Sequence, residues 1–202
     1  KKGIVANPNC STIQMVVSLK PLIERFGLKT VIVSTYQSVS GAGQKGIQEL
    51  TDQVQASLRF ADMSPSIFQE PIAFNLIPYI GQIDANKNCE EENKMIYETR
   101  RMLKKPDLDI FAQCVRVPVL SCHSEALFVC LERQASLSEI KKLFVESQSI
   151  VLWDDDVSHF ATPHKVTGQQ EVFISRVRFA NGQESGNWLQ YWNVADNLKK
   201  GA

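Results

Sequence analysis

The stretch from residue 11 to residue 38 constrains the fold most, because a helix pattern passes there directly into a strand pattern. Residues 11–26 carry apolar side chains at helical spacing, and Gly27 follows as a typical helix-ending residue. Pro21 should end or kink the last turn of this helix. Residues 28–38 are dense in β-branched side chains, which is typical of a strand.

The same alternation of helix and strand patterns continues along the rest of the chain. A capping-box signature at Ser136 and Glu139 opens a helix that should run to about Gln148. Residues 61–88 are less regular, because their prolines confine strands to short or edge pieces. Periodicity predicts further helices at 45–60 and 90–104, and further strands at 110–120, 125–132, 150–153, 171–179 and 187–192. This order predicts an α+β fold, with a mixed, largely antiparallel sheet covered by helices.

The composition is that of an ordinary globular protein. The chain has 202 residues, of which 44% are hydrophobic and 22% charged. Lys+Arg and Asp+Glu balance at 22 each, so nothing predicts a nucleic-acid partner or an anionic membrane surface. No apolar run approaches the roughly 20 residues that span a bilayer, and we expect no signal peptide.

The use of cysteine indicates a reducing compartment. The five cysteines are an odd number with no C-x-x-C pair, which argues against a disulfide framework or a zinc knuckle. Cys114, Cys122 and Cys130 fall in apolar or strand-like stretches and are expected to be inert core residues. We expect a cytoplasmic protein without a bound metal.

Cys10 is the residue that most suggests chemistry. It precedes the apolar residues of the first predicted helix, in the segment Asn7-Pro8-Asn9-Cys10-Ser11-Thr12. Pro8 biases Asn7 toward an extended conformation, so the thiol should lie at the helix N-terminus or one residue before it. Unpaired backbone N–H groups there favour a thiolate and can lower a cysteine pKa from about 8.5 to between roughly 3.5 and 7.5. The sequence therefore favours Cys10 as a nucleophile. The alternative is a buried cysteine packed as a small hydrophobic residue.

Three histidines could serve Cys10 as general acid or base. His159 and His164 lie in a polar, loop-like stretch, where solvent exposure is expected. His123 stands at a predicted strand end, where catalytic groups commonly emerge, although a lone histidine there is more often structural. Seven residues earlier, Arg116 lies in an otherwise uncharged strand and needs an anionic partner. That partner is either a protein carboxylate or a substrate carboxylate held by both arms of the guanidinium.

The start of the helix predicted at 90–104 is more ambiguous. Acidic residues suit a helix N-terminus on dipole grounds alone, so a solvated face is the default interpretation of Glu91 and Glu92. A lysine in this first turn gains nothing from the dipole. Lys94 therefore suggests another anion close by.

Four separated motifs stand in order along essentially the whole chain: Asn7-Pro8-Asn9-Cys10-Ser11-Thr12, Ser34-Thr35-Tyr36-Gln37-Ser38-Val39-Ser40-Gly41-Ala42-Gly43, Arg116-Val117-Pro118-Val119 with His123-Ser124-Glu125, and Val194-Ala195-Asp196-Asn197-Leu198. Four motifs in register are far more specific than any one of them alone. Together they resemble the aspartate-β-semialdehyde dehydrogenase family.

The resemblance implies a fold similar to the C-terminal domain of glyceraldehyde-3-phosphate dehydrogenase, and a reversible reductive dephosphorylation. β-Aspartyl phosphate and NADPH would give aspartate semialdehyde, NADP and phosphate, in the pathway to lysine, threonine and methionine. The partners implied are this small-molecule substrate, phosphate and a second copy of the chain in a homodimer.

The resemblance also implies roles for individual residues. Cys10 would be the acyl-accepting nucleophile, His123 the acid/base catalyst, and Gln37 the residue that orients the acyl intermediate. The other implied roles are Arg116 for the substrate α-carboxylate, Glu91 near its amino group, Lys94 near the phosphate, and Ser40, Gly41 and Asn197 at the nicotinamide cofactor.

The chain departs from the family at both ends. Family members begin with a dinucleotide-binding domain whose Gly-rich turn holds the cofactor pyrophosphate, whereas the Gly41-Ala42-Gly43 segment here lacks the third glycine. The chain begins at Lys1 without a methionine and stops within a helix start at 197–202. We expect residues 1–202 to be the catalytic and dimerisation domain of a longer protein. The N-terminal dinucleotide-binding domain would be absent, the last helix cut at Ala202, and turnover lacking because NADPH cannot be held.

Two other functions stay open. One is a related acyl-phosphate reductase acting on N-acetyl-glutamyl phosphate, although Glu91, Lys94 and Arg116 favour a free amino acid. The other is a non-catalytic interaction module that keeps the fold for dimerisation, although the presence of both Cys10 and His123 argues against it.

Overall fold

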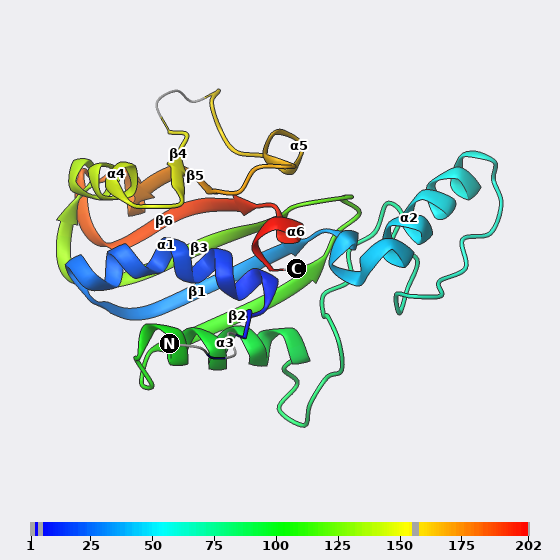
Figure 1. The fold of residues 1–202 in the computed structure, drawn as a ribbon, viewed down its shortest axis with the longest axis horizontal. Coiled ribbons are helices and arrows are strands. Elements are labelled where there is room, and N and C mark those ends of the chain that lie inside the picture. Colours follow the sequence, from blue (N-terminus) through cyan, green and yellow to red (C-terminus); the bar gives the residue numbers. More distant parts are fainter. Residues whose placement is uncertain (1–2, 4–5, 155–157, 202) are drawn as a thin grey trace.

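A single mixed sheet organises the chain (Figure 1). The computed structural model describes residues 3, 6–154 and 158–201, and within them six strands lie in the order β2-β1-β3-β6-β5-β4. The pairs β1–β2 and β4–β5 are parallel, and the other neighbours are antiparallel, which confirms the predicted α+β class. The strands are β1 (Leu28–Gln37), β2 (Asp109–Arg116), β3 (His123–Ser136), β4 (Ile150–Leu152), β5 (Val172–Phe179) and β6 (Ser185–Ala195).

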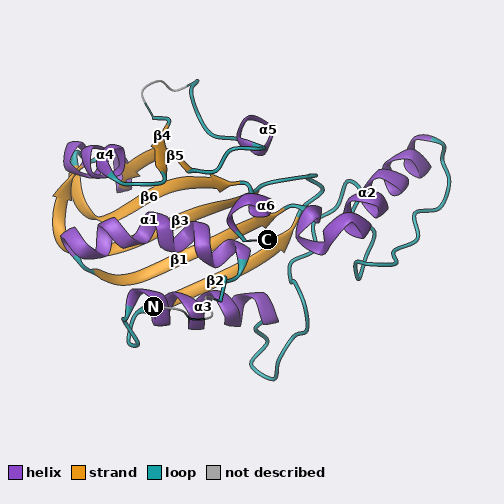
Figure 2. Cartoon of the chain, viewed as in Figure 1, coloured by secondary structure: helices purple, strands orange, loops and turns teal. Residues whose placement is uncertain are grey.

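Helices cover one face of this sheet (Figure 2). Helices α1, α3 and α4 lie on that face, while α2 extends away from the sheet beyond the end of β1. None of the described helices is long and apolar enough to cross a membrane. The helices are α1 (Cys10–Phe26), α2 (Gly43–Leu58), α3 (Glu90–Leu103), α4 (Leu137–Glu146), α5 (Pro163–Val166) and α6 (Asn197–Lys200), with short 3₁₀ turns η1 (Val39–Ala42) and η2 (Ala180–Gly182).

Helix α1 continues past its proline. Pro21 lies inside α1, and the helix runs on to Phe26, so Pro21 does not end it, whereas the alternative of a kink stays a prediction. An interior proline costs about 3 kcal/mol. The helix also buries Leu19, Leu22 and Phe26 against the sheet, and each such side chain contributes roughly 1.5–3 kcal/mol. Burial therefore outweighs the helix-breaking tendency.

The other face of the sheet keeps large apolar side chains exposed. Cross-strand pairing places Phe111, Ile32 and Phe128 side by side on β2, β1 and β3. Their side chains are 62%, 39% and 38% exposed. We call this surface the open face.

The structure moves several predicted boundaries. Strand β2 ends at Arg116 rather than at residue 120, and β3 begins at His123 and extends to Ser136. The capping box at Ser136 is present as predicted. Cys114 and Cys122 are buried, but Cys130 is only half-buried, so its prediction as a core residue is wrong. Ala202 lies outside the described residues.

Candidate active site

Three of the predicted site residues stand side by side at one end of the sheet. Parallel pairing places Gln37 of β1 opposite Arg116 of β2, and antiparallel pairing places Gln37 opposite His123 of β3. His123 in turn lies opposite Ala195 of β6. We call Arg116, Gln37, His123 and Ala195 the site row. The strand pairing thus brings together side chains that are far apart in the sequence.

A second row lies two residues away from the site row on each strand. It faces the same side of the sheet, because alternate residues of a strand share a face. We call it the second row. Its members pair in register across the same four strands: Cys114, Thr35, Glu125 and Asn193. All four side chains are completely buried.

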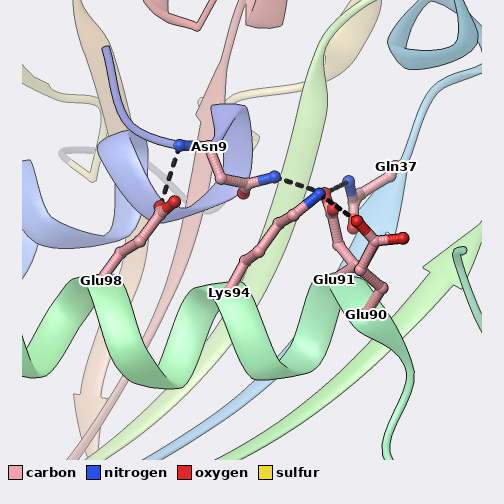
Figure 3. Close-up of polar contacts among 6 residues, drawn as sticks. All are labelled: Asn9, Gln37, Glu90, Glu91, Lys94 and Glu98. Carbon is pink, nitrogen blue, oxygen red and sulfur yellow. Dashed lines mark hydrogen bonds and ion pairs between the residues drawn. The ribbon is translucent and has the colours of Figure 1, made fainter. Parts of the chain in front are cut away.

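Asn9 joins helix α1 to helix α3 above the site row (Figure 3). Its side-chain oxygen accepts the backbone N–H groups of Ser11 and Thr12, which caps α1. Its Nδ2 donates to Glu91 Oε1 at 2.8 Å, and its backbone N–H donates to Glu98 at 2.9 Å. Asn9 received no role from the sequence, although an asparagine just before a helix is a recognisable capping signal.

Glu91 connects this junction to the sheet. Its Oε1 also accepts a hydrogen bond from Gln37 Nε2 at 2.8 Å. Glu91 and Gln37 are both buried. The two predicted site residues therefore contact each other directly, and Glu91 Oε2 makes no hydrogen bond within the described part of the chain.

Cys10 is the first residue of α1, as predicted. The expected lowering of its pKa is wrong for this structure. Burial and the Glu91 carboxylate raise the pKa of the Cys10 thiol from 9.0 to about 11. The Ser11 N–H and the Arg116 guanidinium act in the opposite direction but do not outweigh them. The thiol thus lies within the electrostatic reach of both Glu91 and Arg116.

Arg116 is almost completely buried, with 6% of its surface exposed. Its Nη1 donates to the Ser38 carbonyl at 2.6 Å, and its guanidinium lies 5.8 Å from the centre of the Phe68 ring. Burial lowers its pKa, and Glu91 counteracts that effect. Among the described residues, no carboxylate forms an ion pair with Arg116. The guanidinium therefore keeps donors for an anionic ligand.

His123 is held through one ring nitrogen. Its Nδ1 accepts the backbone N–H of Ser38 at 3.1 Å and also lies 3.1 Å from Ser38 Oγ. Its Nε2 is buried and has no hydrogen-bond partner among the described residues. Complete burial and the nearby Arg116 charge lower the His123 pKa from 6.5 to about 3. The imidazole is therefore neutral at physiological pH.

The residues predicted to touch the cofactor form one group with His123. Asn197 Nδ2 donates to Ser40 Oγ at 3.1 Å, and Ser40 Oγ lies 2.9 Å from Ser38 Oγ. A Cβ on Gly41 would lie 2.8 Å from Arg116 Nη1 and 3.3 Å from His123 Nε2. Only glycine leaves that space open.

Lys94 has a protein partner of its own. Its Nζ pairs with Glu90 Oε1 at 2.7 Å, one helical turn away on α3, and both side chains are about half exposed (Figure 3). Glu90 raises the Lys94 pKa. The anion that the sequence suggested near Lys94 is present in the chain itself, and its role toward phosphate stays a prediction.

The second row contains an acid, Glu125, with no cationic partner among the residues that the structure describes. Glu125 Oε2 accepts a hydrogen bond from Asn193 Nδ2 at 2.9 Å, and Glu125 Oε1 has no partner among the described residues. Burial raises the Glu125 pKa well above 4.5. Asn193 Nδ2 also donates to the Gln14 carbonyl at 3.2 Å, one turn along α1 from Cys10. The second row therefore supports the helix that carries the thiol.

Other candidate groups lie outside the site row. His164 is exposed as expected, whereas His159 is half-buried and stacks on Trp153 with ring centres 5.0 Å apart. Cys89, Glu92 and Cys114 bring possible metal-ligand atoms within 4.8 Å of one another. The Glu92 carboxylate already accepts the backbone N–H groups of Cys89 and Cys114, at 2.8 and 2.9 Å. These bonds account for its position as the cap of α3.

Comparison with known proteins decides the family. Residues 19–200 match the model of the semialdehyde dehydrogenase dimerisation domain. The chain belongs to the semialdehyde dehydrogenase family. The aspartate-semialdehyde dehydrogenases of Aquifex aeolicus and Bacillus subtilis are each 42% identical to it, over 100% and 99% of the chain. The chain spans 59% and 60% of the length of those two relatives.

Solved structures of semialdehyde dehydrogenases agree. The crystal structure of aspartate semialdehyde dehydrogenase II from Vibrio cholerae, complexed with ASA, superposes with a TM-score of 0.93 at 38% identity, covering 98% of this chain and 58% of that one. A more distant structure, the enzyme with NADP from Candida albicans, shares the fold with a TM-score of 0.69 at 22% identity. The resemblance to the aspartate-β-semialdehyde dehydrogenase family inferred from the motifs is confirmed.

Proposed function

We propose that this chain is the catalytic and dimerisation part of an NADP-dependent aspartate-semialdehyde dehydrogenase. The observation that carries the proposal is the site row, with Arg116, Gln37 and His123 in register beneath Cys10 and Glu91. The reaction is the reductive dephosphorylation of β-aspartyl phosphate to aspartate semialdehyde, a step toward lysine, threonine and methionine. A protein of this kind works in the cytoplasm, in keeping with five free cysteines.

The proposed chemistry begins at Cys10. Its sulfur forms a bond to the acyl carbon of the substrate as the S–H bond breaks, and the bond from that carbon to the phosphate oxygen breaks. Phosphate leaves with the electron pair and takes up the thiol proton, and a thioester remains. Reduction of the thioester gives a thiohemiacetal oxyanion, whose C–S bond then breaks to release the aldehyde and the thiolate. His123 lies in the site row to assist this collapse.

Substrate recognition follows from the two charged residues of the site. The free donors of buried Arg116 suit the α-carboxylate, because a guanidinium can hold a carboxylate through two parallel hydrogen bonds. Glu91 suits the α-amino group, and its hydrogen bond from Gln37 fixes the amide that would orient the acyl intermediate. A substrate with both charges is a free amino acid, which favours aspartyl phosphate over an N-acetylated relative.

We propose that the cofactor is held mainly by a dinucleotide-binding domain in another part of a longer protein. The residues here fit the nicotinamide end, because Gly41 leaves open the space next to Arg116 and His123 that a side chain would fill. Ser40, the residue before Gly41, is hydrogen-bonded to Asn197. The cofactor, when bound, supplies the hydride for the thioester.

The open face supports a homodimer. Its aromatic and aliphatic side chains are exposed in one row across three strands, which is the character of an assembly surface. We therefore propose that two copies pair through the open face.

The test is phosphate-dependent reduction of NADP with aspartate semialdehyde as substrate, comparing this chain with the full-length protein. Full-length protein should be active and this chain alone should not. A Cys10→Ser change in the full-length protein should lower kcat by more than about 10³-fold, because the thioester cannot form. Cys130→Ser, a half-buried cysteine of β3 outside the site row, is the matched control.

Two outcomes would contradict the proposal. Robust turnover by the 202-residue chain would remove the need for a further cofactor domain. A faster reaction with N-acetyl-glutamate semialdehyde than with aspartate semialdehyde would assign the site to the related reductase.

A further inference from the structure

We propose that Ser38 is a positioning residue that holds the single proton of neutral His123 on Nε2, which makes His123 a fixed hydrogen-bond donor to the carbonyl oxygen of the acyl intermediate. The identity of the group that accepts the hydrogen bond from His123 Nε2–H rests on the proposed function. Which nitrogen carries the proton follows from the geometry of this chain alone.

The backbone N–H of Ser38 decides the tautomer. An amide N–H can only donate, and it points at His123 Nδ1 from 3.1 Å. A ring nitrogen that accepts a hydrogen bond carries no proton, so a neutral imidazole here has its proton on Nε2. Protonation of Nδ1 would set two hydrogens against each other, which excludes the imidazolium as well.

Side chains behind Ser38 reinforce this direction. Because Nδ1 is an acceptor, Ser38 Oγ at 3.1 Å can only donate to it. Ser38 Oγ can then accept from Ser40 Oγ at 2.9 Å, and Ser40 Oγ accepts from Asn197 Nδ2 at 3.1 Å. The hydroxyls of Ser38 and Ser40 also lie within 3.3 Å of Asn197 Oδ1. If they donate to Asn197 Oδ1 instead, the hydrogen bond from the Ser38 backbone N–H to His123 Nδ1 is unchanged.

The titratable groups around the His123 ring also disfavour a second proton on it. Arg116 of β2 repels a second proton, and complete burial removes the solvent that would stabilise a cation. On β3 itself, burial raises the Glu125 pKa well above 4.5, and burial together with Glu91 raises the pKa of the Cys10 thiol on α1, so both neighbours favour their uncharged forms. His123 is thus kept as a neutral donor rather than as a proton acceptor.

A small open space lies beside the free donor. The position of a Cβ on Gly41 is 3.3 Å from both Nε2 and Cε1 of His123 and 2.8 Å from Arg116 Nη1, so this space borders the ring edge and the guanidinium. Donors aimed at the site of developing negative charge are among the strongest contributors to catalysis. A substrate oxyanion placed in line with Nε2–H, next to this space, would be stabilised by it.

The reaction balances without a proton leaving His123. Hydride addition to the thioester carbon moves an electron pair onto the carbonyl oxygen. Nε2–H donates a hydrogen bond to that oxyanion, and the pair returns as the C–S bond breaks and the thiolate departs. The acid/base role that the family resemblance implies for His123 is thereby narrowed to hydrogen-bond donation.

The direct test is a long-range proton–nitrogen correlation spectrum of protein labelled with ¹⁵N-histidine. We expect Nδ1 unprotonated and Nε2 protonated for His123 from about pH 5 to pH 9. A His123 with its proton on Nδ1, or one that is doubly protonated at neutral pH, overturns the proposal. This measurement needs neither cofactor nor turnover.

Two substitutions at Ser38 separate its backbone from its side chain. Ser38→Ala keeps the N–H and should keep the Nε2–H tautomer and, in the full-length enzyme, kcat within about threefold. Ser38→Pro removes the N–H at a residue whose φ of −63° already suits proline. It should allow a proton on Nδ1, so that the Nδ1–H tautomer of His123 appears in the spectrum, and lower kcat by about a hundredfold, while burial and Arg116 still hold the His123 pKa low. A folded Ser38→Pro protein with an unchanged spectrum overturns the proposal.

The two proposals fail separately. The expected spectrum in a full-length protein without phosphate-dependent NADP reduction would refute the proposed function and leave the tautomer assignment standing. An active enzyme with the opposite spectrum would refute only the role of Ser38.

Discussion

The site row and the second row bury polar side chains in opposite ways. In the site row, Arg116 stays charged and keeps donors for a ligand, and Gln37 contacts the Glu91 carboxylate. In the second row, Glu125 is buried without a cationic partner in the described part of the chain, and burial raises its pKa well above 4.5. One step deeper on the same face, Val33, Leu127 and Tyr191 form an almost entirely apolar row.

The difference teaches how this sheet isolates charge. Two residues of a strand advance about 7 Å, so the environment changes from charged to neutral polar to apolar within about 14 Å. A net charge is kept only where a ligand can neutralise it. The neutral second row then separates that charge from the core and holds α1 through Asn193.

Breaking the site row should have the largest effect. Arg116→Met removes the donors for the substrate carboxylate, and kcat/KM for aspartate semialdehyde in the full-length enzyme should fall by about a hundredfold. Arg101→Met, on the exposed side of α3, is the control and should change it less than threefold. Steady-state kinetics measure both. Equal kinetics for the two variants would contradict the assignment of Arg116.

The buried neutral pair predicts a plateau in stability against pH. Between its folded pKa of about 3 and its ordinary 6.5, His123 binds a proton only when unfolded, so stability rises with pH. Above its ordinary 4.5, Glu125 holds a proton only when folded, so stability falls with pH. Each slope is about 1.4 kcal/mol per pH unit, and the two cancel between 4.5 and 6.5.

Single substitutions of His123 or Glu125 should reveal the pH dependence of stability that the other residue contributes. In His123→Gln, stability should fall continuously from about pH 4.5 upward, because only the Glu125 effect remains. In Glu125→Gln, it should rise to about pH 6.5 and then stay level. Urea unfolding of the chain at a series of pH values measures this. A parent protein whose stability changes steeply between those pH values would refute the picture of two neutral groups.

The smallest predicted effect tests whether Lys94, at the outer edge of the site, contributes to phosphate binding. Lys94–Glu90 and Lys20–Glu24 are matched exposed pairs, each with a 2.7 Å contact between residues one helical turn apart. Lys94→Met should raise the KM for phosphate about fivefold to tenfold, because a cation near the phosphate is lost. Lys20→Met should leave the KM for phosphate unchanged, and melting temperatures of both variants should be similar. An equal KM in the two variants would remove Lys94 from the phosphate site.

Local pattern was enough to predict much of the fold. The stripe of α1, the β-branched run of β1 and the capping box at Ser136 are encoded in neighbouring residues, and the structure places all three as expected. The register that aligns Gln37 with Arg116 and His123 depends on contacts between distant strands. Sequence periodicity does not encode it, and the site row followed only from the family resemblance.

The chemistry of the site was less predictable still. The helix N-terminus beneath Cys10 is visible in the sequence, but the burial and the Glu91 carboxylate that raise its pKa come from the tertiary fold. Ser38 acts through a backbone N–H, which every residue except proline possesses. A role of that kind leaves no signature in the side-chain pattern.

The alternation along β1 joins two tasks in one strand. Gln37 belongs to the site row, and its neighbour Tyr36 is 38% exposed on the opposite side of the sheet. A molecule bound to the open face therefore touches a side chain one peptide bond away from the site. A single-residue insertion in β1 would exchange the two faces and damage assembly and chemistry in one event. In evolution, this strand can change its residues but not its length.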